Sequence, residues 1–305
     1  MIVPEKYTQL SALIDAQLRE FPEHTGYLAK RFSDADEKHL HLADDLAHMV
    51  LVIAGEQLAQ ICSDYRWLTQ MVLDEEWEFR RTGRYRLSTF DDAVAQVYSN
   101  KAFMTRYMNG LLASQLWWRN HTEVLGFFRD RFVPGNAPGF SHLEVGPGHG
   151  LFLHLAATAK NCGSAQGWDI SSASLDATQA AMHRLGAHAN VTLLMVNLFE
   201  APKAIFQSIA FSEVLEHLED PLKALQILHG LLDDNGRIFI NAPVNSPAPD
   251  HIYLFSAPEE IVGMVEAAGF DVCESHFSPA SGATLAQARK RKLSISAAII
   301  ATKRR

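Results

Sequence analysis

Three glycines at alternate positions, Gly146, Gly148 and Gly150, separate a short apolar run from an apolar helical stretch. Glycine is required where the backbone bends sharply or approaches a ligand closely, because a Cβ atom would clash there. The helix that begins after the glycines offers free N–H groups and the positive end of its dipole. A strand, a glycine-rich turn and a helix start predict a site for a nucleotide-like cofactor at the mouth of a parallel sheet.

Two carboxylates stand where such a cofactor needs hydrogen-bond acceptors. Glu144 lies two residues before the first glycine, and Asp169 is near the end of the next apolar run, which finishes in GWDI. A carboxylate at the C-terminal end of that strand can accept hydrogen bonds from both ribose hydroxyls. We therefore expect Asp169 to bind the sugar, with Ile170 packed against the sugar or the adenine. The alternative is that Asp169 only serves the turn before the next helix.

Two histidines are the candidates for proton transfer. His217 lies in SEVLEHLEDP and His251 in PDHIYLF. Imidazole titrates near neutral pH and can take a proton from a hydroxyl or an amine. We expect His217 and His251 to be the catalytic residues. Glu75 or Glu76, from the N-terminal part of the chain, is the alternative base.

The glycine turn with its acid, E-x-G-x-G-x-G, resembles the cofactor loop of class I S-adenosylmethionine (SAM)-dependent methyltransferases. Residues 212–221 (SEVLEHLEDP) and 249–270 (PDHIYLFSAPEEIVGMVEAAGF) resemble the ubiquinone/menaquinone-type group of that family. The resemblance covers residues 141–305, about half of the chain. It implies an α/β fold with a doubly wound, mostly parallel seven-stranded sheet of the Rossmann-like type, SAM as the cofactor, and methyl transfer as the reaction.

The resemblance also implies roles around the cofactor. Glu144 is expected to hold the amino end of SAM, with the three glycines lining the loop. The third strand ends in VNLFE, where the family usually has an aspartate in place of Asn197, although an asparagine can still accept and donate hydrogen bonds. Asn197 and Leu198 are expected at the adenine, with Leu198 in its apolar wall. Glu213 is also expected to bind the cofactor.

A second resemblance concerns Glu213, Glu216, His217 and His251. Small-RNA 2′-O-methyltransferases use a similar glutamate, glutamate–histidine and later histidine set to bind a divalent metal ion, for which such side chains are suitable ligands. The glutamate–histidine pair also occurs in related enzymes without a metal, where the histidine lines the acceptor pocket or braces a loop. We expect no metal here, and activity that does not depend on one.

The composition is that of an ordinary globular protein, with 48% hydrophobic and 20% charged residues in a chain of 305. A formal net charge of −8 gives no electrostatic footprint for a nucleic acid. Three scattered cysteines form no metal pattern and suit a reducing cytosol. The sequence has no visible signal peptide and no apolar run as long as a membrane span. We expect a cytoplasmic protein that binds neither nucleic acid nor membrane.

Two regions must position these residues. Before the segment VPGNAPG (residues 133–139), apolar residues recur at helical spacing over 40–70 and 93–132. After it, strands and helices alternate, which predicts a parallel, doubly wound sheet. We expect a helical region over residues 1–134 and a SAM-binding domain over 135–305.

The expected elements of the second region follow from its apolar periodicity. The expected strands cover residues 141–145, 165–170, 191–197, 208–214, 236–243, 270–278 and 293–302. The expected helices cover residues 149–160, 173–185, 221–232 and 258–268. No helix is expected between the last two strands, which would form an antiparallel pair at the sheet edge.

The helical region is expected to close over the cofactor and to supply the acceptor pocket. It is rich in aromatic residues, and four arginines lie close to Trp77 and Tyr85 in the charged, turn-like stretch 74–92. Arginine can bind a carboxylate or phosphate through two hydrogen bonds, and aromatic faces stabilise a sulfonium or ammonium cation. Trp77, Arg81 and Tyr85 are the predicted acceptor contacts. The alternative is a bundle in which they are core or surface residues.

The expected reaction is SN2 methyl transfer from SAM to a hydroxyl or amine of a small-molecule acceptor. Three alternatives stay open: methylation of a thioether such as methionine, methylation of an intermediate bound to a carrier protein, and a catalytically inactive SAM-binding module that binds a partner protein. A homodimer also stays open.

Overall fold

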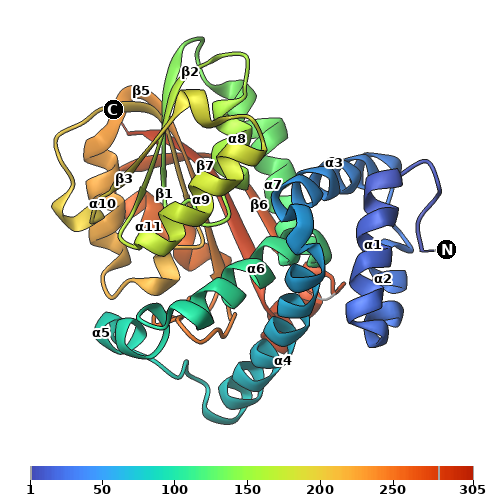
Figure 1. The fold of residues 1–305 in the computed structure, drawn as a ribbon. Helices are drawn as coiled ribbons and strands as arrows, with labels where there is room; N and C mark the ends of the chain where they lie inside the picture. Colours follow the sequence, from blue (N-terminus) through green and yellow to red (C-terminus); the bar gives the residue numbers. More distant parts are fainter. Residues whose placement is uncertain (1, 281, 305) are drawn as a thin grey trace.

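The computed structural model describes residues 2–280 and 282–304. Its centre is a seven-stranded sheet with the order β3-β2-β1-β4-β5-β7-β6 (Figure 1). Neighbouring strands are parallel except that β7 is antiparallel to both β5 and β6. The strands are Phe140–Val145 (β1), Cys162–Asp169 (β2), Val191–Met195 (β3), Phe206–Ser212 (β4), Leu232–Val244 (β5), Phe270–Pro279 (β6) and Ile295–Lys303 (β7). The expected fold class is confirmed.

The parallel half of the sheet brings the expected site residues to one edge. β1 pairs with β2 and with β4, so Val145 lies opposite both Trp168 and Phe211. Gly146 and Glu213, which follow β1 and β4, and Asp169, the last residue of β2, therefore meet at the carboxyl ends of the strands. The interior of β1 is buried because helices cover both faces of a parallel sheet.

Helices alternate with strands along the C-terminal part. They are Leu151–Ala157 (α8), Ser172–Arg184 (α9), Pro221–Leu231 (α10), Pro258–Ala267 (α11) and Leu285–Arg291 (α12). The expectation of no helix between the last two strands is wrong, because α12 lies there. Its start carries a capping box in which Thr284 and Gln287 bond each other's backbone N–H groups, a T-x-x-Q signal that the periodicity alone does not reveal.

Seven helices precede the sheet among the described residues. They are Thr8–Glu20 (α1), Thr25–Phe32 (α2), Glu37–Ala54 (α3), Leu58–Thr82 (α4), Phe90–Ala93 (α5), Lys101–Trp117 (α6) and Arg119–Phe127 (α7). A π-helical turn, Val94–Tyr98, joins α5 to α6. In Figure 1, α6 runs from the N-terminal helices across the edge of the sheet towards α5.

Helix α4 corrects the expectation of a turn-like stretch over residues 74–92. It continues through DEEWEFRR and ends only at Gly83, which adopts a left-handed conformation with φ of 73°. Glutamate and arginine are good helix formers, and glycine is the usual residue at such an end. Trp77 and Arg81 therefore lie on a regular helix.

The helical region and the sheet share one hydrophobic core. Phe128 contacts the ring of Phe239 on β5, at 5.0 Å between centroids, and the ring of Phe152 on α8, also at 5.0 Å. Phe132 lies 5.6 Å from the same Phe239 ring. The packing therefore continues across the domain boundary expected near residue 134.

The helical run from Glu37 to Thr82 is, by length and composition alone, sufficient to cross a membrane. Gly55, with φ of 50°, separates α3 from the turn that leads into α4. Leu42, Leu46 and Val50 are buried in the shared core. The expectation that the protein does not bind a membrane stays a prediction.

Candidate cofactor and acceptor site

A cavity of about 620 Å³ lies at the carboxyl ends of β1, β2, β4 and β5, under α6. One side of it is formed by the glycine turn, Glu144, Asp169 and Ile170. The opposite side is formed mainly by side chains of the segment 90–124 and of the loop after β5, among them Tyr98, Met104, Tyr107, Gln115, Asp250 and His251. A cavity of this size and mixed polarity is typical of small-molecule sites.

The glycine turn has the backbone that the sequence predicted. Gly146, Gly148 and Gly150 all have positive φ, at 73°, 51° and 79°. A Cβ on Gly146 would stand 2.7 Å from Val214 Cγ2, and one on Gly148 would stand 3.3 Å from Cε of Met108 on α6. The three glycines therefore allow both the bend and the close approach of neighbouring elements.

Glu144 is buried and incompletely paired. It is 2% exposed, and its Oε2 has no hydrogen-bond partner among the described residues. Burial raises the pKa of this carboxyl well above its usual range. Because the residue also lines the cavity, a cationic ligand group there would supply the missing partner and favour the carboxylate.

Asp169 serves the turn before α9 and also lines the cavity, and its role at the ribose stays a prediction. Its Oδ1 accepts the Ser171 N–H at 2.8 Å and its Oδ2 accepts the Ser174 hydroxyl at 2.7 Å, so it braces the start of α9. It also lines the cavity, beside the half-exposed Ile170. Burial raises the pKa of Asp169, and the hydrogen bonds from Ser174 and Ser171 partly oppose this rise. Each oxygen keeps a lone pair for a ligand hydroxyl.

Asn197 and Leu198 lie outside the lining of this cavity. The Asn197 side chain is exposed and accepts the Phe199 N–H at 3.0 Å, which caps the short 3₁₀ turn after β3. Leu198 is buried in the core beneath the sheet. Their expected roles at the adenine stay predictions.

Glu213 follows β4 in a left-handed conformation with φ of 56° and lines the cavity. Its Oε1 accepts a hydrogen bond from Asn241 Nδ2 on β5 at 2.8 Å. Burial raises the pKa of Glu213 to about 7, and the nearby Asp250 carboxylate adds to the effect, while the Asn241 hydrogen bond opposes it.

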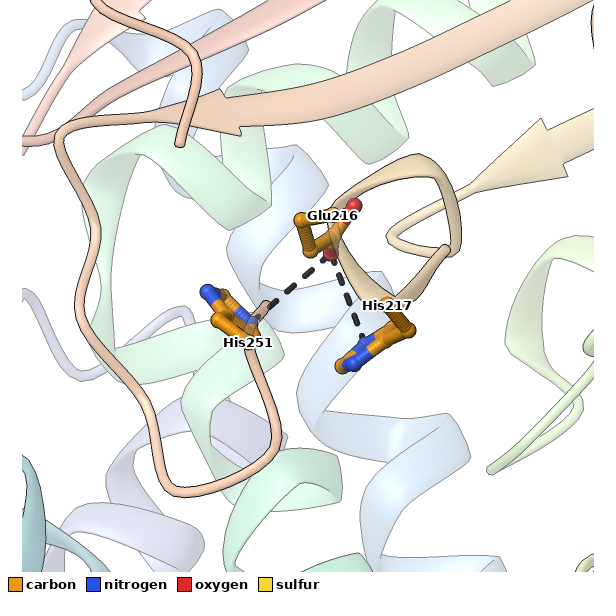
Figure 2. A group of neighbouring side chains, drawn as sticks. All are labelled: Glu216, His217 and His251. Carbon is orange, nitrogen blue, oxygen red and sulfur yellow. Dashed lines mark ion pairs between the residues drawn. The ribbon is translucent and has the colours of Figure 1, made fainter. Parts of the chain in front are cut away.

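Beyond Glu213, three side chains converge: Glu216, His217 and His251 (Figure 2). Glu216 is fully buried, and Figure 2 shows the two imidazoles on either side of its carboxylate. Its Oε1 lies 3.6 Å from His217 Nε2 and 3.9 Å from His251 Nε2. Burial raises the pKa of Glu216 well above its usual range and lowers the pKa of His251 to about 4.

Asp250 joins this cluster to α6. Its Oδ1 accepts the Tyr107 hydroxyl at 2.9 Å, and its Oδ2 accepts the Tyr98 hydroxyl at 3.3 Å. Its backbone oxygen lies 3.0 Å from His217 Nδ1. Sequence reasoning missed Tyr98, Tyr107 and Asp250. The aspartate directly before His251 was a signal, but nothing in the sequence paired it with two tyrosines more than 140 residues away.

The three predicted acceptor contacts lie outside the cavity lining in this structure. Trp77 is 75% exposed, and Arg81 is paired with Glu78 on the solvent side of α4. Tyr85 is buried behind the cavity wall, where its hydroxyl accepts the Ser246 N–H at 3.0 Å and its ring lies against His251. Their roles as acceptor contacts remain untested predictions.

The alternative bases also lie away from the cavity lining. Glu75 is buried in an ion pair with Arg86, at 2.9 Å, and Glu76 is paired with Arg80 at 2.5 Å. Each is therefore held in the N-terminal region. His217 and His251, by contrast, both line the cavity.

A family model described as a methyltransferase domain matches residues 117–288, more than half of the chain. The match begins within α6, before the glycine turn, and ends in α12. No curated protein was found to be similar to this chain in sequence.

Solved structures with the same fold include an O-methyltransferase family protein from Burkholderia thailandensis, 14% identical, with a TM-score of 0.56 over 81% of this chain and 72% of that one. The mitomycin 7-O-methyltransferase MmcR is 13% identical, with a TM-score of 0.55 over 88% and 76%. A putative methyltransferase from Haloferax volcanii, solved with the Trm112 activator, is 14% identical, with a TM-score of 0.54 over 69% and 99%. At these identities the likeness concerns the fold.

Proposed function

The chain belongs to the methyltransferase family, and on that premise we propose that it transfers the methyl group of SAM to a hydroxyl or amine of a small molecule bound in the cavity. The observation that carries the proposal is one continuous cavity that joins the glycine turn to a wall of tyrosines and histidines. The methyl donor and the acceptor can thus lie side by side in it.

The residues present fit SAM as the cofactor. The unpaired, buried Oε2 of Glu144 suits the ammonium group of the methionine part. The Asp169 carboxylate lines the cavity and can accept further hydrogen bonds, so it suits the ribose hydroxyls. Gly146 and Gly148 line the cavity without a side chain, so a ligand can approach the backbone of the turn there. When bound, SAM supplies an electrophilic methyl group on a sulfonium.

The far side of the cavity supports a small acceptor. Met104, Met108 and Leu111 of α6 line it together with Phe152. Its polar groups include Tyr98, Tyr107, Gln115, His121, Asp250, His217 and His251. Few polar groups within an apolar lining typically fix the orientation of a small ligand. A net charge of −8 is unfavourable for a nucleic acid acceptor.

The main contribution of the chain to the reaction is alignment. Glu144 and Asp169 fix the two ends of the cofactor, while α6 fixes the acceptor against it. Correct placement of two reactants can contribute about 7–11 kcal/mol to lowering a barrier. His217 and His251 are the side chains best placed to interact with the reacting oxygen or nitrogen, since both line the acceptor side.

The proposal is tested by incubating the purified protein with methyl-labelled SAM and a panel of small phenols, alcohols and amines, with methionine and an acyl-carrier-protein substrate as further arms. We expect label to move to at least one hydroxyl or amine of the panel. An Asp169→Ala variant, deficient in SAM binding, is the control for background transfer.

Two outcomes would contradict the proposal. Labelling of methionine or of the carrier-bound substrate alone would make one of those the acceptor class. SAM binding in calorimetry without transfer to any acceptor would favour a catalytically inactive binding module.

A further inference from the structure

One carboxyl group and two imidazoles face one another in the cluster of Glu216, His217 and His251. Both carboxylate oxygens of Glu216 lack a hydrogen-bond partner among the described residues, although the side chain is fully buried. A buried carboxylate without donors is costly, so its surroundings need an explanation.

The protonation of the two imidazoles follows from their other nitrogens. His251 Nδ1 lies 2.6 Å from the backbone oxygen of Ser246, and His217 Nδ1 lies 3.0 Å from the backbone oxygen of Asp250. The Tyr98 hydroxyl also lies 3.2 Å from His217 Nδ1, but it donates to Asp250 Oδ2. A carbonyl oxygen only accepts, so we assign the proton of each neutral ring to Nδ1. The Nε2 atom of each ring then carries a lone pair, and both are directed towards Glu216 Oε1 (Figure 2).

The distances exclude hydrogen bonds within the cluster. A proton shared between Glu216 Oε1 and either Nε2 atom would require a separation of about 2.6–3.2 Å. The observed separations are 3.6 and 3.9 Å, and the ligand atoms of all three residues lie within 4.8 Å of one another. Two ligands about 2.1 Å from a tetrahedral ion lie about 3.4 Å apart. The atoms of the cluster are thus spaced much like ligands around an ion. Small rotations of the imidazole rings would bring the two Nε2 atoms to ligand distance.

We propose that Glu216, His217 and His251 bind a divalent transition-metal cation such as Zn²⁺, Fe²⁺ or Mn²⁺. Two imidazoles and one carboxylate form a known type of site that leaves further coordination positions open, and imidazole favours transition metals over Mg²⁺ and Ca²⁺. The proposal departs from the expectation, drawn from the sequence, that the site holds no metal.

The surroundings support the ligands as they do in established metal sites. A metal-binding histidine usually donates its second N–H to a carbonyl or a carboxylate, which fixes the tautomer and the ring orientation. Both histidines do so here. The loop that carries His251 is held by the backbone. The N–H groups of Ile252 and Tyr253 both donate to the backbone carbonyl oxygen of Glu216, at 2.9 Å each. The tautomers of both rings and the loop that carries His251 are therefore held in place before any ion binds, and only small ring rotations remain.

The open side of the site faces the acceptor. His217 and His251 line the cavity, whereas Glu216 lies behind them with no exposed surface. An ion held by the three would thus present its free positions to the cavity. This part of the inference rests on the proposed function: an acceptor with a phenolic, carboxylate or similar oxygen would bind the ion directly. The two imidazoles then act as ligands and are not free to act as bases.

The experiment measures ion binding alone, without SAM or acceptor. The full chain is freed of metal with a chelator and titrated with Co²⁺ and Zn²⁺, followed by calorimetry and, for Co²⁺, by visible absorption. We expect one equivalent to bind at micromolar affinity or tighter. Glu216→Gln and His217→Gln should each weaken binding by at least about 100-fold, more than the roughly 10–100-fold loss typical of residues outside the ligand set.

The control variant is His183→Gln. His183 and His188 form another close pair of imidazoles on the exposed surface of the chain, with 4.3 Å between their ring centroids. Its removal should leave the cavity site intact, so binding equal to wild type is expected. A melting curve of each variant in metal-free buffer confirms that it is folded, and His217→Gln serves as the test if Glu216→Gln does not fold.

The proposal is overturned if wild type binds neither ion, or if folded Glu216→Gln and His217→Gln bind them as tightly as wild type. It is also overturned if His183→Gln removes the binding, since the surface pair would then be the site. A protein that binds the ion but methylates nothing supports the ion site and contradicts only the proposed function. A protein that transfers the methyl group but binds no ion supports the proposed function and contradicts the ion site.

Discussion

Asp169 holds the start of α9 in place and also faces the cofactor side of the cavity, so the two roles must be separated. Asp169→Ala is expected to weaken SAM binding by about tenfold or more, because hydrogen bonds to a charged group contribute about 1.5–3 kcal/mol. Calorimetry measures the change. Ser174→Ala is the matched control, since it removes a bond to Asp169 but leaves the carboxylate, and it should bind SAM nearly as wild type. Equal affinity of Asp169→Ala and wild type would contradict the assignment.

His142 gives the fold a specific pH dependence. It is fully buried on β1, its Nδ1 lies 2.9 Å from the Ser208 hydroxyl, and burial lowers its pKa to about 3. The unfolded chain therefore binds this proton more readily than the folded chain. The resulting stability is present above about pH 6.5 and is lost as the pH falls towards 3.

Replacement of His142 by leucine should remove that dependence. Between pH 8 and pH 5, the free energy of unfolding of wild type should fall by about 2 kcal/mol more than that of His142→Leu. Urea unfolding of both proteins at the two pH values measures the difference. Equal losses in the two proteins would mean that His142 does not supply this proton linkage.

At the scale of elements, the loop between β5 and α11 depends on Tyr85. The Tyr85 hydroxyl accepts the Ser246 N–H, and the Ser246 carbonyl in turn holds His251. Tyr85→Phe leaves that N–H without its partner, which costs about 1–3 kcal/mol. The variant should have a lower melting temperature and a higher acceptor KM, with SAM affinity near wild type. An unchanged acceptor KM would show that the loop keeps His251 in place without Tyr85.

The helical course of α4 changes what is expected of Trp77 and Arg81. Both side chains lie on its solvent side, away from the cavity lining. Trp77→Ala and Arg81→Ala should therefore keep acceptor kinetics close to wild type, in contrast to Tyr85→Phe. Steady-state kinetics with the acceptor found in the labelling screen checks this. A raised acceptor KM in either variant would restore its predicted role as an acceptor contact.

More of the residues predicted for the glycine-turn side of the cavity line it than of those predicted for the α6 side, for a physical reason. The glycine turn, Glu144 and Asp169 are set by local backbone geometry at strand ends, which glycine spacing and apolar runs reveal. Tyr98, Tyr107 and Asp250 meet only through the packing of α6 on the sheet, and no local pattern records that packing. The tautomers of the two histidines likewise depend on carbonyl groups whose positions the sequence does not fix.

At the scale of the molecule, the N-terminal helices are part of the main core. Phe128 and Phe132 cover Phe152 and Phe239 on the sheet side. Burial of one large apolar side chain is worth about 1.5–3 kcal/mol, and a whole domain is stable by only about 5–15 kcal/mol. Residues 135–305 expressed alone should therefore aggregate or lack a cooperative unfolding transition. Circular dichroism and urea titration test this, and a cooperative, SAM-binding fragment would show that the sheet domain folds independently.

The segment 90–101, which contains the π-helical turn, forms one wall of the cavity. Phe90, Val94 and Tyr98 line the cavity from inside, while most of its neighbouring residues are exposed to solvent. Its ties to the sheet domain include the Phe90 N–H bonded to Glu219 and the Tyr98 hydroxyl bonded to Asp250. Brief opening of a single layer requires far less energy than separating a shared core. We therefore expect ligand exchange to proceed through this segment: its amides should exchange hydrogen faster than those of α7, and should slow when S-adenosylhomocysteine binds.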